Sequence, residues 1–77
     1  MNTTTLERLN KLYNEHDIIK GTGYLHVLHQ TYLQDEGRIW YVHRYLSNGN
    51  GFYDLTGISP YYFTSRDQAL AYAIRAC

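Results

Sequence analysis

The stretch that decides the fold runs from Gly23 to Asp54 and reads GYLHVLHQTYLQDEGRIWYVHRYLSNGNGFYD. It is rich in β-branched and aromatic residues, which suit the pleated, half-buried surface of a sheet. Two polar segments that contain glycine interrupt it, at residues 34–38 and 48–49. The pattern predicts three antiparallel strands over residues 23–33, 38–47 and 51–56, joined by two tight turns.

The chemistry of the two turns predicts how these strands pair. A three-residue loop at the first turn places Gly37 in the left-handed conformation that glycine tolerates. Asn48 followed by Gly49 is typical of a two-residue type I′ turn. The resulting register sets His29 opposite His43 and His43 opposite Asp54. Neither face of the sheet is then polar, although a sheet with one solvated face should alternate between apolar and polar residues.

Helical patterns flank the sheet on both sides in the sequence. Residues 4–16 carry leucines at helical spacing and begin with Thr4-Thr5-Leu6-Glu7, which matches a capping box. Residues 65–76 begin with a second capping box, Ser65-Arg66-Asp67-Gln68, and carry small alanines at helical spacing. Residues 61–63 are a candidate edge strand.

These patterns together predict the fold class. We expect one small α+β domain over residues 1–77, in the order α-β-β-β-α. Its antiparallel sheet should have three or four strands, and both terminal helices should lie on one face of it.

Composition limits the classes of function. The 77 residues include seven basic and seven acidic side chains, so the formal net charge is zero. Nucleic-acid binding by counterion release requires a basic stripe, and nucleic acid is therefore disfavoured as the partner. No apolar run approaches the length of a membrane span, and residues 1–11 lack the features of a signal peptide. With Cys77 as the one cysteine, we expect a cytoplasmic protein that makes no contact with a membrane.

The predicted order of elements resembles that of the double-stranded-RNA-binding domain. That family grips phosphates with basic residues at the start of its last helix. The corresponding helix here begins Ser65-Arg66-Asp67-Gln68, with one arginine beside an aspartate. The resemblance therefore covers topology alone, and an RNA-binding role is a lesser alternative.

One constellation in the predicted sheet resembles a site for chemistry, the cross-strand row His29–His43–Asp54. Two imidazoles and a carboxylate on one face could hold a metal such as zinc or form an acid–base pair. The neighbouring Tyr41 is a poor zinc ligand, and the chain contains no Gly-x-Ser-x-Gly, Cys-x-x-Cys or His-Glu-x-x-His motif. We therefore expect His29 and His43 to be structural or solvent-facing, with no metal, no cofactor and no enzymatic activity. A metal-dependent enzyme built on this row is the alternative.

A cluster of aromatic residues and one arginine lies on the sheet face predicted to point away from the helices. Its members are Tyr24, Tyr32, Trp40, Arg44 and Tyr53. Tyrosine, tryptophan and arginine dominate the energetics of protein interfaces, and an exposed patch of this kind is uncommon on a monomer without a partner. We expect a non-enzymatic binding protein that docks this surface on a protein partner.

The size of the chain and its lack of motifs favour one kind of partner. Small proteins of phage and other mobile elements that inhibit a host enzyme or a defence complex, anti-CRISPR proteins among them, have these properties. The partner expected here is accordingly a host macromolecular complex. One alternative is a homodimer that buries the spare sheet face against its own copy. Another is that residues 58–63 close this face into a second small core.

Overall fold

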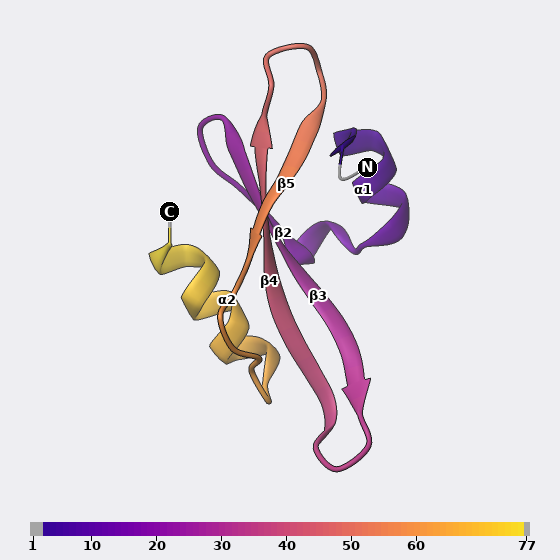
Figure 1. Cartoon of the computed structure of the whole chain (residues 1–77), viewed down its shortest axis with the longest axis vertical. Coiled ribbons are helices and arrows are strands. Elements are labelled where there is room, and N and C mark those ends of the chain that lie inside the picture. Colours follow the sequence, from indigo (N-terminus) through magenta and orange to yellow (C-terminus); the bar gives the residue numbers. More distant parts are fainter. Residues whose placement is uncertain (1–2, 77) are drawn as a thin grey trace.

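A five-stranded antiparallel sheet forms the centre of the computed structural model, which describes residues 3–76 (Figure 1). The strands lie in the order β1-β5-β4-β3-β2. Their bounds are β1 Thr3–Thr4, β2 Ile18–Lys20, β3 Tyr24–Leu33, β4 Gly37–Ser47 and β5 Tyr53–Ile58. The helices are α1 Leu6–Leu12, a short 3₁₀ helix η1 Glu15–Asp17, and α2 Arg66–Arg75. The molecule is a small compact α+β domain, as the sequence pattern predicts.

Two of the five strands were not expected from the sequence. β1 pairs with β5, and β2 pairs with β3. Strands of two and three residues are too short to display the alternation that reveals a strand. The prediction of three or four strands in the order α-β-β-β-α is therefore wrong, and the likeness to the RNA-binding family in element order does not hold.

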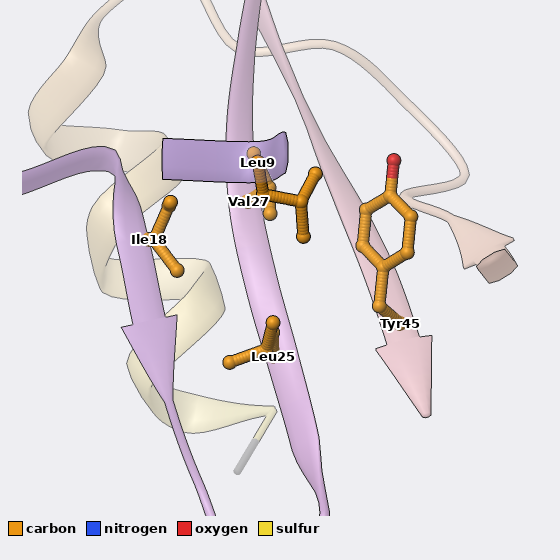
Figure 2. Close-up of a cluster of buried hydrophobic side chains, with 5 residues drawn as sticks. All are labelled: Leu9, Ile18, Leu25, Val27 and Tyr45. Atoms are coloured by element: carbon orange, nitrogen blue, oxygen red, sulfur yellow. The ribbon is translucent and has the colours of Figure 1, made fainter. Parts of the chain in front are cut away.

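The two helices pack on opposite faces of the sheet. Leu9 of α1 is buried with Val27, together with Leu25, Ile18 and Tyr45 (Figure 2). Ala69 and Ala73 of α2 are buried against Leu28 and Val42. Successive residues of a strand point to opposite faces, so Val27 and Leu28 mark the α1 face and the α2 face. The prediction that both helices share one face is wrong, because each face carries apolar residues that need a cover.

The first turn keeps the predicted positive φ at Gly37, but its unpaired residues are 34–36 and its register is shifted. Gly37 takes a φ of 79°, a conformation that glycine tolerates. Leu33 pairs with Gly37, and His29 therefore lies opposite Tyr41 and not opposite His43. The shift equals two residues on one strand, and side chains alternate with a period of two. The assignment of β3 and β4 residues to faces is therefore unchanged.

The second turn is longer than predicted. Ser47 pairs with Tyr53, and the Asn48 amide donates to the Phe52 carbonyl at 3.0 Å across the loop of residues 48–52. Gly49 and Gly51 take φ values of 85° and 84°, and within residues 3–76 no other residue type has positive φ. A type I′ turn would need Asn48 or its equivalent in that conformation. The two glycines supply it instead, so the prediction of an Asn48-Gly49 turn is wrong.

This longer loop reverses the faces of β5. Tyr45 pairs with Leu55, whereas the predicted register set Tyr45 opposite Phe52. A shift by an odd number of residues moves every side chain to the other face. Tyr53 and Leu55 consequently pack against the core under α1.

Side-chain caps fix where the two helices begin. Thr5, and not the predicted Thr4, accepts a hydrogen bond from the Arg8 amide at the start of α1. Ser65 accepts from the Gln68 amide at the start of α2, as its capping box predicts. Residues 61–63 form only an isolated bridge, in which Phe63 pairs with Trp40. α1 is shorter than its predicted range of residues 4–16, because η1 and β2 take up the residues that follow.

Candidate functional site

α2 lies across the middle of the surface that the sequence predicts for binding. Its alanines cover Leu28 and Val42, halfway along the α2 face. Tyr24 and Arg44 are on one side of this contact, and Tyr32 and Trp40 are on the other side, toward the β3–β4 turn. The expectation of a sheet face without a helix is therefore wrong, and the aromatic cluster is divided into two.

The half that contains Tyr24 is engaged in contacts within the molecule. The guanidinium carbon of Arg44 lies 5.5 Å from the centroid of the Tyr24 ring, and the His26 ring centroid lies 5.1 Å from it. The Tyr24 ring also lies over the backbone at Gly21, where an added Cβ would come within 2.1 Å of it. Tyr24 is thus held in place by its neighbours, whereas Arg44 is exposed.

Tyr53 does not belong to either half. It is paired with Ser47 at the start of β5 and packs against the core cluster of Leu9 on the α1 face. Its place follows from the reversed faces of β5. The structure therefore keeps four of the five predicted residues on the α2 face, in two separate pairs, Tyr32 with Trp40 and Tyr24 with Arg44.

The half that contains Tyr32 forms a continuous group that we call the hairpin patch. It consists of Gln30, Tyr32, Arg38 and Trp40. All four lie on the α2 face, between the Leu28–Val42 pair and the β3–β4 turn. The Tyr32 side chain is 67% exposed. Trp40 is half-buried, and its backbone exchanges hydrogen bonds of 2.9 and 2.8 Å with Phe63. The patch therefore has an exposed aromatic ring beside a well-anchored one.

An open hollow of about 390 Å³ adjoins the hairpin patch. Its far wall is held by Arg66, whose Nε donates to the Asp17 carboxylate at 2.8 Å. The Arg66 guanidinium also donates to the His16 carbonyl at 2.8 Å, which ties the start of α2 to η1. Residues from both ends of the chain line this hollow with the patch: Asn14, His16, Asp17, Gln30, Arg38, Trp40 and Arg66.

A second group of polar side chains lies on the α1 face. The Tyr13 hydroxyl is 2.8 Å from His29 Nδ1, and the His29 and His43 rings stack with centroids 4.6 Å apart. Asp54 is on the other face, where it accepts a hydrogen bond of 2.7 Å from the Thr3 hydroxyl. The structure therefore brings His29 and His43 together on one face, as predicted, but they are not directly paired, and the prediction that Asp54 completes the row is wrong. Within residues 3–76 no group of three histidines, cysteines or acidic residues could hold a metal ion.

Burial favours the neutral forms of His43 and Tyr13 in this group. Burial, followed by the nearby His29, lowers the pKa of His43 to about 4. Burial also raises the pKa of the Tyr13 hydroxyl, with a further contribution from Tyr45. The buried His26 on the α2 face likewise has a lowered pKa, because of burial and the charge of Arg44. The rings of Tyr13, His29 and His43 can fasten α1 to the sheet, but Asp54, the predicted carboxylate partner, lies on the other face.

No protein-family model, curated protein or solved structure matches this chain. No helix in the described part of the chain is long and apolar enough to cross a membrane. The argument for function therefore starts from the geometry of the hairpin patch and of the histidine group.

Proposed function

We propose that this protein is a non-enzymatic binding protein that docks the hairpin patch on a protein partner. The observation that carries the proposal is Tyr32, a large aromatic side chain that is 67% exposed beside the anchored Trp40. An exposed tyrosine, a tryptophan and an arginine in one group are the residue types that supply most of the binding energy in protein interfaces. Arg38 lies opposite Tyr32 and would provide directional hydrogen bonds to a carboxylate or carbonyl.

Charge favours a protein over a nucleic acid as the partner. Of the two arginines near the hollow, Arg66 is already paired with Asp17. The turn beside the patch carries Asp35 and Glu36, which would repel phosphates. A surface that binds nucleic acid needs several unpaired cations along the backbone. The hairpin patch offers Arg38 alone with a large aromatic area, which suits a protein surface.

The histidine group is a poorer basis for function than the hairpin patch. General acid–base catalysis by histidine commonly uses a carboxylate that orients the ring. Asp54, the predicted candidate, is on the opposite face of the sheet from His43. The proposed role is therefore occupancy of a partner's surface, the mode of action of a small inhibitor of a host enzyme or defence complex.

We expect Tyr32→Ala to weaken binding of the partner by about 2 kcal/mol, or about 30-fold in Kd. Its ring is exposed in the free protein, so its loss should change folding stability little. The partner is first isolated by affinity capture and mass spectrometry, and the Kd is then measured by titration. The fluorescence of Trp40, the single tryptophan, reports on contact at the patch.

Phe52→Ala is the matched control for Tyr32→Ala. Phe52 is also an exposed aromatic residue, but it lies in the β4–β5 loop, at the opposite end of β4 from the β3–β4 turn (Figure 1). A protein captured by the wild type and by Phe52→Ala, but not by Tyr32→Ala, supports the proposal. Equal capture by all three would place the interface elsewhere. Trp40→Ala is a weaker test, because Trp40 also packs against the core under α2.

A further inference from the structure

The outer edge of β3 is open over its second half. β3 pairs with β4 along its whole length, but β2 covers only Leu25, His26 and Val27 on the other side. Within the part of the chain that the structure describes, residues 28–33 have a strand on one side only. Figure 1 shows this half of β3 at the margin of the sheet.

The hydrogen-bond pattern identifies which backbone groups point outward from this edge. The Ser47 amide donates to the Gly23 carbonyl at 2.8 Å, which makes the odd-numbered residues of β3 the ones bonded to β4. Trp40, the β4 partner of Gln30, exchanges its hydrogen bonds with Phe63 instead. The amide and carbonyl groups of Gln30 and Tyr32 are therefore directed to the open edge.

This edge lacks the charged and proline side chains that commonly keep strands apart. Natural sheets protect their edges with lysine, proline, bulges or very short strands. Residues 28–33 read LHQTYL and contain no Lys, Arg, Asp, Glu, Pro or Gly. The one irregularity of pairing near β4 is on its other side, toward β5. An edge of this length and composition is a ready site for another strand.

We propose that a second copy of this chain pairs antiparallel with this edge, with Thr31 at the two-fold axis. In antiparallel pairing, a residue whose amide and carbonyl point toward the other strand must lie opposite a residue of that strand whose amide and carbonyl point back. This register satisfies that condition, because Gln30 then meets Tyr32 of the second copy and exchanges both hydrogen bonds with it. Leu28 is at the η1 end of the open stretch, where it lines an open hollow with His29, Gln30 and residues 12–14 and 17, and it stays outside the pairing.

A second copy suits this edge better than an unrelated extended peptide. Each copy carries the same uncovered edge, so one symmetric pairing protects both. The net charge of zero means that copies do not repel one another. At the axis, exposed Thr31 would face Thr31 of the second copy, and threonine pairs are favourable across strands. The pairing uses backbone groups and does not depend on the protein partner proposed above.

The test is the mass of the protein in solution, measured by sedimentation velocity and light scattering. The wild type should be a dimer that dissociates on dilution. Thr31→Lys and Thr31→Glu should each sediment as a monomer at concentrations where the wild type is dimeric, because like charges then meet at the axis. An equimolar mixture of the two variants should recover the dimer, since lysine then faces glutamate.

Asn50→Lys is the control, because it adds the same charge as Thr31→Lys in the exposed β4–β5 loop at the other end of the sheet. It should remain a dimer. Circular dichroism checks that the Thr31 variants keep the fold, as expected for an exposed position. A monomeric wild type at the highest soluble concentration would overturn the proposal. So would a dimer that persists in both Thr31 variants, or a mixture that stays monomeric.

Discussion

Leu9→Ala will lower the free energy of unfolding by about 2–5 kcal/mol, which is the range for leucine removed from a packed core. Leu9 is 1% exposed and is the one buried residue of α1. A helix of seven residues is not stable alone, so its packing holds it in place. Without the Leu9 side chain, α1 loses its main contact with Leu25 and Val27. A domain of this size has a net stability of only a few kcal/mol, so a large fraction should unfold.

Urea denaturation followed by circular dichroism measures this loss. Leu12→Ala is the matched control, because Leu12 is in the same helix and is 69% exposed. Its replacement removes the same atoms without opening a cavity, and alanine is at least as good a helix former as leucine. A loss in Leu12→Ala as large as that in Leu9→Ala would show that the burial of Leu9 is not the source of the lost stability.

The first hairpin and the second helix could be predicted from the sequence because their signals are local. Gly37 supplies a positive φ, and Ser65 caps the helix that follows it. The strand faces of β3 and β4 also follow from alternation, since the shift at the first turn is even. These elements needed no knowledge of distant residues.

The rest of the fold depends on choices between sequence signals of similar strength. Asn48-Gly49 and Gly49 with Gly51 both permit a turn, and the longer loop reversed the faces of β5. Because both sheet faces carry apolar residues, the sequence could not show which face each helix covers. This reversal also changed the candidate site, because Tyr53 and Asp54 each lie on the face opposite to the predicted one.

The hairpin patch could be predicted in part. Tyr32 and Trp40 were found from residue type and strand alternation. Arg38 is two residues before Trp40 and therefore on the same face of β4, opposite Tyr32. Its position next to an acidic turn does not indicate a binding residue. The wall built by Arg66 and Asp17 joins residues 49 positions apart. A pairing of that range has no local sequence signal.

The stability of this domain should fall as the pH drops from about 6.5 to about 4. His43 has a pKa of about 4 in the folded protein, compared with an ordinary value of 6.5. Within this window the unfolded chain binds a proton that the folded protein resists, so protonation favours unfolding. The full stabilisation from neutral His43 is present above pH 6.5. A shift of this size corresponds to on the order of 2–3 kcal/mol, allowing for partial exposure.

Denaturant titrations at several pH values between 7.5 and 4.5 test this dependence. His43→Phe keeps a ring that can stack on His29 but removes the titrating group, so its free energy of unfolding should vary less with pH. Part of the slope should remain, because His26 on the other face also has a lowered pKa and contributes with the same sign. An unchanged pH slope in His43→Phe would mean that protonation of His43 costs the folded protein little. The His43 ring would then be more accessible to water than its stacking on His29 indicates.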